Sequence, residues 1–193
     1  SSNGLAAAGV TSRVTLVGLK VCTPGTAANG WRGSCPNSST LNAILYAADN
    51  GIPIINMSLG GEFQRRSVAN SGGEGVSYIE TINAVFNYAH EKGTTIVVSA
   101  GNSAYDMQHD KNGYKSYCDS PHVICVSATG PAVAPAHGTY ADVDQLASYS
   151  NYGGKVVVAA PGGAGRNGTP VNVGWVYSSC SGFSLAVTNA SGA

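Results

Sequence analysis

The apolar residues of this chain gather in short continuous runs instead of alternating with polar residues. Continuous apolar strands are typical of a sheet that is covered on both faces, and helical connections between successive strands favour parallel pairing. We therefore expect an α/β fold, a doubly wound, mostly parallel sheet with helices on both faces. The expected strands are Arg13–Val21, Ile52–Met57, Thr95–Ala100, Val123–Ala128, Lys155–Ala160 and one within Val171–Tyr177.

Two stretches between these strands have the apolar spacing of amphipathic helices. The first follows Ser39, a residue type that caps helices, and ends at Gly51, while the second ends at Gly93. The Gly- and Ser-rich segment Glu62–Gly75 is expected to be a loop that leads into the second helix. The apolar positions are Leu41, Ile44, Leu45 and Ala48 in the first helix and Ile79, Ile82, Phe86 and Ala89 in the second.

Length and composition predict a single domain that binds neither nucleic acid nor an anionic membrane. The 193 residues suffice for one hydrophobic core, so we expect a single domain over residues 1–193. Ten acidic residues balance ten basic ones, which favours neither nucleic acid nor an anionic membrane. Only 10% of the residues are charged, against roughly a quarter in an average soluble domain. The surface must then be covered largely by Ser, Asn, Gly, Thr and Tyr, which is common in secreted hydrolases. No apolar run reaches the roughly 18 residues that a membrane helix needs. We expect a monomer.

The five cysteines favour an oxidising compartment. Cys22 and Cys35 bracket a loop rich in Gly, Pro and Ser, and Cys118 and Cys125 bracket a short turn, so each pair can close as a local disulfide. The alternative is five reduced thiols. Cys180 is left without a partner in this scheme. No C-x-x-C spacing occurs, which disfavours zinc.

Small and polar residues follow the expected strands at their carboxyl ends, where parallel sheets collect their functional groups. These positions are Ser58–Gly61, Ser99–Asn102 and Pro161–Gly163. Glycines let a ligand's backbone approach closely, and the amide of Asn102 is a hydrogen-bond donor suited to a developing oxyanion. The alternative is that Asn102 only turns the chain after a strand.

Other motifs have simpler explanations. Gly163–Gly168 has the G-x-G-x-x-G spacing of a dinucleotide-binding turn, but a turn and a strand are expected after it instead of the required helix. Ser58 lies in a context similar to a nucleophile elbow, which also needs a following helix. Polar loops hold Asp106, His109 and Asp110, and also Asp142 and Asp144. The polar surroundings of Asp106, His109 and Asp110 indicate a solvated surface loop instead of a metal or catalytic site. Asp142 and Asp144 are weak evidence for a bound calcium ion.

Four segments in order resemble the middle third of subtilisin-like serine proteases: Val14–Val21, Ile54–Gly61, Ile96–Asn102 and Ala147–Gly162. In that family the catalytic Asp and the His of an HGTH-type helix precede the first segment, and the Ser of a GTSMA-type helix follows the last. None of the four histidines here has an HGTH context, and no GTSMA occurs. The resemblance implies a subtilisin-like domain that is truncated at both ends and inactive by itself.

The resemblance also implies roles for individual residues. Ser58, Leu59 and Gly60 would pair with a polypeptide substrate as an added strand, Ser99, Ala100 and Gly101 would line the specificity pocket, and Asn102 would be the oxyanion-hole asparagine. The implied function is that of a secreted endopeptidase that needs no cofactor for its chemistry, with a structural calcium ion left open. The alternatives are a noncatalytic subtilase relative that binds peptides and a nucleotide-binding α/β enzyme.

Overall fold

The computed structural model describes residues 10–11, 13–26, 33–65, 74–109, 112–131 and 144–163. The chain divides into two compact units. We call residues 18–99 and 110–125 the helical unit, and residues 1–17, 100–109 and 126–193 the strand unit.

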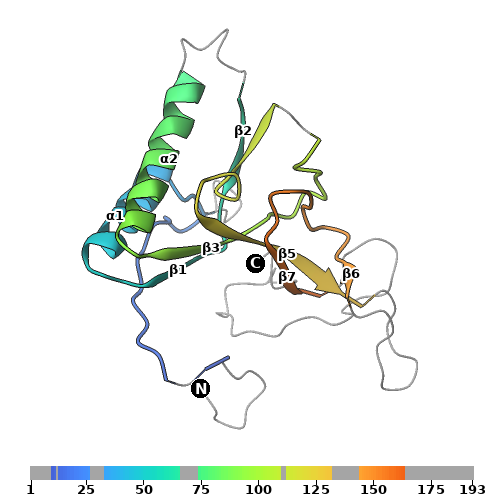
Figure 1. Cartoon of the computed structure of the whole chain (residues 1–193), viewed down its shortest axis with the longest axis horizontal. Coiled ribbons are helices and arrows are strands. Elements are labelled where there is room, and N and C mark those ends of the chain that lie inside the picture. The colour runs from blue at the N-terminus through green and yellow to red at the C-terminus, as the bar shows by residue number, and fades with distance from the viewer. Residues whose placement is uncertain are drawn as a thin grey trace. The chain divides into compact units, whose positions relative to one another are not determined.

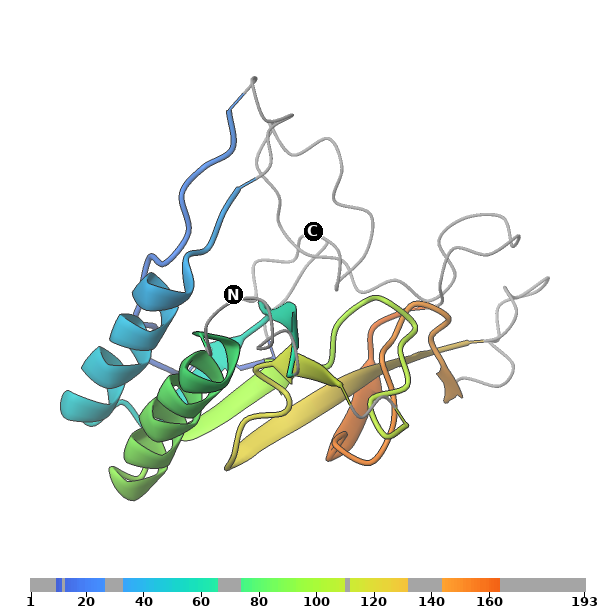
Figure 2. The ribbon, with the colours of Figure 1, turned by 90° about the horizontal axis from the view of Figure 1, so that it is seen from above.

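Two helices and two parallel strands form the centre of the helical unit. The helices are α1 (Asn37–Asp49) and α2 (Glu74–Glu91), and the strands are β1 (Ile54–Met57) and β3 (Thr95–Ser99). Strand β1 pairs with β3 in parallel, from Ile54 opposite Thr95 to Met57 opposite Val98. The helices lie side by side next to these strands (Figures 1 and 2). Since they contact each other, they cover the same face, and a helix on the second face stays a prediction.

The core of this unit uses the apolar positions that the helical spacing predicted. Ile82, Phe86 and Ala89 are at most 1% exposed, and Ile96 and Val98 of β3 are each 1% exposed. Full burial of a large apolar side chain such as Ile82 or Phe86 contributes about 1.5–3 kcal/mol relative to leaving it exposed. The core also includes Leu41, Ile44, Ala47, Ala48, Met57 and Ile79.

Glycine ends both helices, as the sequence predicted. Gly51 and Gly93 have φ angles of 66° and 83°, which glycine adopts without a steric penalty. The predicted start of α1 was wrong, because the helix begins at Asn37 and Ser39 lies inside its first turn. Pro36 is the N-cap residue with φ −57°, and its carbonyl accepts the N–H of Thr40 at 3.1 Å. The fixed φ of proline already suits a helix entry.

The predicted loop after Gly61 is partly a strand. Residues Gly61–Gln64 form β2, which pairs antiparallel with β4 (Gly113–Ser116). Both strands are short and mostly polar, so no apolar pattern marks them. Their partners also lie about fifty residues apart in the chain, which local sequence cannot reveal.

The expected first strand, Arg13–Val21, was wrong. The structure assigns no strand to these residues, and Val14, Leu16 and Val17 are 58%, 88% and 53% exposed. An apolar, β-branched run becomes a strand only when a neighbouring strand takes up its backbone hydrogen bonds.

The strand unit contains most of β5 (Val123–Gly130). The first three residues of this strand belong to the helical unit, and those from residue 126 onward belong to the strand unit. Strand β7 (Val158–Pro161) pairs with β5 in parallel, and the short β6 (Gln145–Leu146) pairs with it antiparallel. The strand order is β1-β3-β5-β6, with β7 also bonded to β5. This confirms an α/β fold with a mostly parallel sheet, although β7 starts three residues later than predicted. The strand expected within Val171–Tyr177 lies outside the described residues.

Both predicted disulfides are confirmed. Cys22 is bonded to Cys35 and Cys118 to Cys125, with Cα–Cα distances of 4.0 Å and 5.1 Å. The second bond is buried, since Cys118 and Cys125 are 3% and 0% exposed. Cys180 lies outside the described residues.

Candidate active site

The segment Ser58–Gly60 connects two strands of the helical unit. It follows β1 directly and precedes β2, with Ser58 and Gly60 exposed and Leu59 half-buried. Among the described strands, β1 is at one end of the sheet order. The segment is therefore accessible, and both of its ends continue into paired strands.

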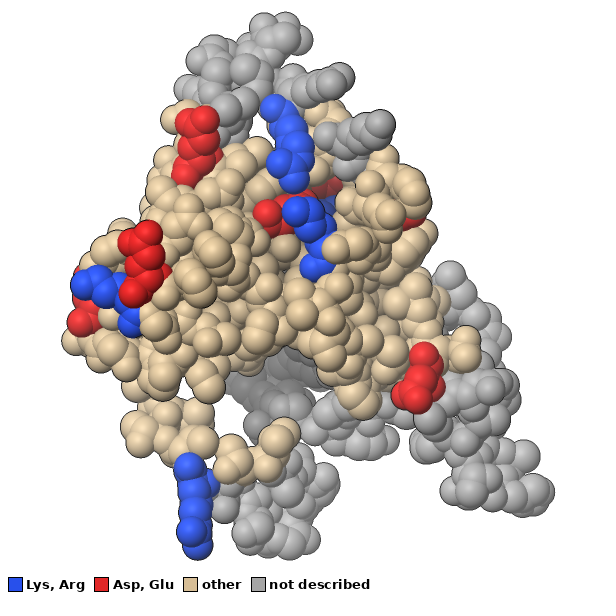
Figure 3. Space-filling model, in the orientation of Figure 1, with Lys and Arg blue, Asp and Glu red and all other residues tan. Residues whose placement is uncertain are grey.

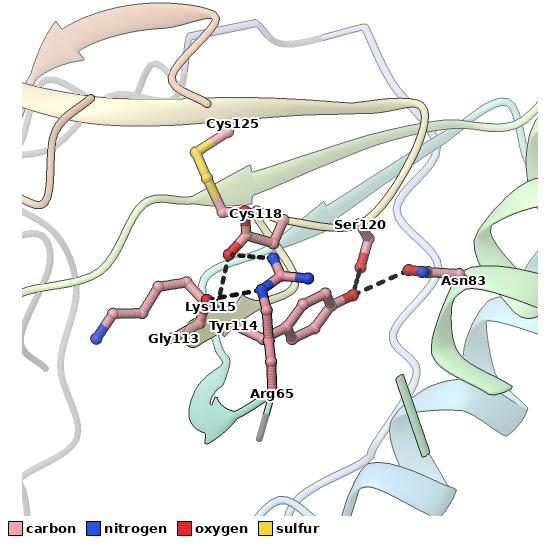
Figure 4. Close-up of polar contacts among 9 residues, drawn as sticks. Arg65, Asn83, Gly113, Tyr114, Lys115, Cys118, Ser120 and Cys125 are labelled. Carbon is pink, nitrogen blue, oxygen red and sulfur yellow. Dashed lines mark hydrogen bonds and ion pairs between the residues drawn. A yellow bond between two sulfur atoms is a disulfide. The ribbon is translucent and has the colours of Figure 1, made fainter. Parts of the chain in front are cut away.

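Charged side chains hold β2, the strand that follows Ser58–Gly60 in the chain, against β4. Lys115, whose side chain is 7% exposed, contacts Glu62 directly opposite it in the register, with Nζ and Oε2 2.5 Å apart. Arg65 lies 3.5 Å from the buried carboxylate of Asp119 and donates from Nε to the Gly113 carbonyl at 3.0 Å (Figure 4). A buried charge is tolerated when it is paired and hydrogen-bonded, as both are here.

Tyr114 lies beneath Arg65 and extends this network toward α2 (Figure 4). The guanidinium carbon is 5.0 Å from the ring centroid, a cation–π contact. The tyrosine hydroxyl bonds Asn83 of α2 at 3.0 Å and Ser120 at 2.8 Å. Burial raises the pKa of Tyr114 above its ordinary value, so the hydroxyl stays a protonated donor even in moderately alkaline solution. The paired strands β2 and β4, which follow Ser58–Gly60, are thus bonded to helix α2. Through Asp119 and Ser120 they are also bonded to the turn closed by the Cys118–Cys125 disulfide.

The second predicted segment, Ser99–Asn102, begins at the carboxyl end of β3. Ser99 is the last residue of the strand and is exposed. Ala100, only 4% exposed, donates its N–H to the carbonyl of Val126 in β5 at 2.8 Å. Gly101 has a φ of 103°, and Asn102 after it is exposed. The chain therefore turns sharply at Gly101 and presents Asn102 at the surface of the strand unit.

Asn151, a residue that the sequence analysis did not single out, holds this turn. Its side-chain amide donates to the Ala100 carbonyl at 2.7 Å and accepts the N–H groups of Ser103 and Tyr105, each at 3.0 Å. Its backbone N–H also donates to the Gly101 carbonyl at 3.0 Å. At 2% exposure the amide is buried with its hydrogen bonds made. Its only sequence signal is its place in the segment Ala147–Gly162.

Gly101 is required where it is, because a Cβ atom there would lie 2.6 Å from the Asn151 side-chain nitrogen. That distance is far below van der Waals contact, and the φ angle is one that other residues rarely adopt. The turn itself therefore accounts for the glycine before Asn102.

Asp106 and His109 form an exposed surface turn, as the sequence analysis favoured. The two side chains are 2.6 Å apart, with His109 78% exposed. Asp106 also accepts the N–H groups of Gln108 and His109. The hydrogen bond from His109 lowers the pKa of Asp106 below its ordinary value. Asp110 lies outside the described residues.

The remaining candidates add no site in the described part of the chain. Ser58 is followed by β2 and not by a helix, which confirms that it is no nucleophile elbow. No group of three or more potential metal ligands occurs among the described residues. Asp144 is exposed, while Asp142 and residues 164–168 of the G-x-G-x-x-G motif lie outside them.

The face in Figure 3 carries few charged side chains, and both signs occur among them. No helix within the described ranges has the length and apolar character needed to cross a bilayer.

Comparison with known proteins identifies the family. The profile of the Subtilase family, peptidase family S8, matches residues 1–193. The chain is 32% identical over 160 residues to thermitase of Thermoactinomyces vulgaris, covering 83% of this chain and 45% of thermitase. It is 33% identical over 130 residues to a thermophilic serine proteinase of Bacillus sp. (strain AK1), covering 67% of this chain and 25% of that protein. An extracellular protease of Xanthomonas campestris is 32% identical over 169 residues, covering 80% of this chain and 24% of that protein.

Solved structures agree on the fold. The nisin leader peptidase of Lactococcus lactis superposes with a TM-score of 0.54 at 19% identity, covering 67% of this chain and 38% of that one. The epidermin leader peptide processing serine protease of Staphylococcus aureus gives a TM-score of 0.54 at 23% identity, covering 68% and 32%. The chain belongs to the subtilase family of serine proteases. It spans between a quarter and about half of the length of the curated relatives named above.

Proposed function

We propose that this chain is the central part of a secreted, monomeric serine endopeptidase that hydrolyses peptide bonds of proteins. The observation that supports it best is the rigid turn at the end of β3, which presents the exposed Asn102. The serine, histidine and aspartate of the reaction would come from segments outside these residues. A noncatalytic peptide-binding relative is the alternative, whereas family membership replaces the nucleotide-binding hypothesis.

In this proposal the side-chain amide of Asn102 donates a hydrogen bond to the carbonyl oxygen of the scissile peptide bond as that oxygen gains negative charge. The turn held by Asn151 would orient this amide before the reaction, so that the transition state is stabilised without a cost of reorganisation. In subtilisin, a member of this family, removal of the corresponding donor costs about 2.7–4 kcal/mol.

Ser58, Leu59 and Gly60 would bind the substrate chain as an added strand, and Ser99, Ala100 and Gly101 would line the pocket for one side chain. Accessible backbone at the end of a sheet is what such strand addition requires. Ala100 is buried with both backbone groups bonded, so it would shape the pocket through the backbone around it. The chemistry needs no cofactor, and a structural calcium ion stays open.

Secretion is supported by the two disulfides, which persist in oxidising compartments, and by the Xanthomonas relative, an extracellular protease by name.

The decisive experiment replaces Asn102 in the complete protease that contains this chain. Asn102→Ala should lower kcat by roughly 10²–10³ with little change in KM, because the hydrogen bond forms chiefly in the transition state. Asn102→Asp should be as low or lower, because a carboxylate repels the oxyanion. Asn50→Ala is the control, an exposed asparagine that bonds only the Tyr46 carbonyl at the end of α1. An unchanged kcat in Asn102→Ala would remove the catalytic role.

Labelling separates an enzyme from a noncatalytic relative. We expect residues 1–193 alone to remain unlabelled by a serine-directed fluorophosphonate, and the complete protein to be labelled once per molecule. Stoichiometric labelling of residues 1–193 would show that the nucleophile lies within them. No labelling of the complete, folded protein would favour the peptide-binding alternative.

A further inference from the structure

The side chain of Asn151 contacts the loop of the candidate oxyanion donor on both sides of that donor. It bonds Ala100 before Asn102 and Ser103 and Tyr105 after it, in each case through a backbone atom. The backbone N–H of Asn151 adds a fourth bond, to the Gly101 carbonyl. All of these residues belong to the strand unit.

These bonds determine where Asn102 lies. Asn102 is exposed, and the turn before it passes through Gly101 at a φ of 103°. With Ala100, Ser103 and Tyr105 fixed to one buried amide, the backbone of residues 101 and 102 has little freedom left. An asparagine suits this task, because one amide group supplies a donor for the carbonyl and an acceptor for the two N–H groups.

A second set of bonds fixes Asn151 itself. Its neighbour Ser150 accepts the Ala128 N–H of β5 at 2.9 Å and donates to the Asn151 carbonyl at 3.0 Å. Tyr149 and Tyr152 on either side form backbone bonds with Ala104 and Tyr105. The amide is therefore part of a network of hydrogen bonds that connects the loop to β5.

We infer that Asn151 is a positioning residue for the reaction, one that sets the place of the Asn102 amide without touching the substrate. The inference rests on the proposed function, since it needs Asn102 to act as the oxyanion donor. A displacement of about 1 Å in a catalytic group can cost on the order of 10²-fold in rate. Loss of the Asn151 amide should thus lower the rate even though Asn102 is unchanged.

The test is a double-mutant cycle in the complete protease. Asn151→Ala should lower kcat by roughly 10- to 100-fold with KM little changed, because a misplaced donor weakens only the transition state. In an Asn102→Ala background, Asn151→Ala should lower kcat by no more than about twofold further, because its route of action is already removed. A merely structural role would lower the melting temperature and leave kcat per folded molecule unchanged, and an effect independent of Asn102 would give the same loss of kcat in both backgrounds.

Two further variants keep the test decisive. Asn151→Asp retains an oxygen for the Ser103 and Tyr105 N–H groups and loses the donor to Ala100, so its kcat should lie between those of the wild type and Asn151→Ala. It also replaces Asn151→Ala in the cycle if that variant does not fold. Thr94→Val is the matched control, since it removes another buried bond from a side chain to a backbone carbonyl, that of Ile52, in the helical unit. It should lower the melting temperature and leave kcat unchanged.

The outcomes are distinguishable. If Asn102→Ala leaves kcat unchanged, Asn102 is not the oxyanion donor and the inference fails with that role, whereas failure of the endopeptidase proposal itself would appear as absence of labelling in the complete protein. If Asn102→Ala lowers kcat but the Asn151 variants do not, the inference alone is overturned. Equal losses in both backgrounds also overturn it. Amide hydrogen exchange gives an independent check, because Ser103 and Tyr105 should exchange faster in Asn151→Ala, and unchanged exchange would contradict the inferred contact.

Discussion

Tyr117 should make the stability of this protein fall in alkaline solution. The residue is 1% exposed, its ring stacks on Phe86 with centroids 5.4 Å apart, and its hydroxyl donates to Asn37 at 2.6 Å. Burial raises the pKa of Tyr117 to about 12, from 10.0 in an exposed tyrosine. The neutral hydroxyl is therefore favoured in the folded state.

The direction of the effect follows from proton binding. Between the two pKa values the unfolded chain has lost the Tyr117 proton and the folded protein still holds it, so stability falls as the pH rises. The contribution is complete below about pH 10 and is lost progressively toward pH 12. For pKa values of 10 and 12, the loss is about 1.4 kcal/mol at pH 11.

Tyr117→Phe isolates this contribution. The variant should be less stable than the wild type at pH 8, by about 1 kcal/mol for the lost hydrogen bond, but should lose about 1.4 kcal/mol less between pH 8 and pH 11. Urea unfolding at both pH values measures the two differences. Tyr78 and Tyr114, whose pKa values burial also raises, are present in both proteins, so their own losses cancel apart from their charge interaction with Tyr117. Equal losses in the two proteins would refute the reasoning.

Two other changes test the backbone of the fold. Replacing Cys118 and Cys125 together by alanine should cost about 2.5 kcal/mol in urea unfolding, since the bond closes a loop of sequence separation 7, and a cost below 1 kcal/mol would contradict this. Gly153→Ala should cost about 2 kcal/mol or more, because φ is 118° and the new Cβ would lie 2.8 Å from the Gln108 nitrogen. Gly154→Ala is its control, with no atom nearer than 3.5 Å, and equal melting temperatures for the two variants would show that the Gly153 conformation adapts.

Features encoded in a local pattern could be predicted from the sequence. The helices, the strands β3 and β5, and both disulfides follow from apolar spacing, continuous apolar runs and short cysteine separations. In α2 the predicted positions Ile79, Ile82, Phe86 and Ala89 are the buried ones. Family resemblance added the roles of Asn102 and Ser58–Gly60, which still await an experiment.

Features that depend on a distant partner could not be predicted. The run Arg13–Val21 has a strand's composition, but composition does not say whether a neighbour will pair with it. Strands β2 and β4 show the reverse case, because their residues have no strand pattern in the sequence. They form strands because they pair with each other and because Arg65 and Lys115 make contacts there. The role of Asn151 has the same origin, because nothing near it in the chain shows that its amide meets Ala100.

The hydrogen bonds of Asn151 involve only main-chain atoms of the loop, so no side chain of the loop takes part in them. Ser103 and Ala104 are both exposed, and a change at residue 103 to any residue except proline, which lacks the backbone N–H, removes none of those bonds. Ala104 has a φ of 51°, a left-handed value that Gly, Asn and Asp adopt more readily than other residues, so changes at that position are less freely tolerated. Position 103 is thus open to diversification by random mutagenesis, and residues there can alter what the loop contacts while the turn beside it stays in place.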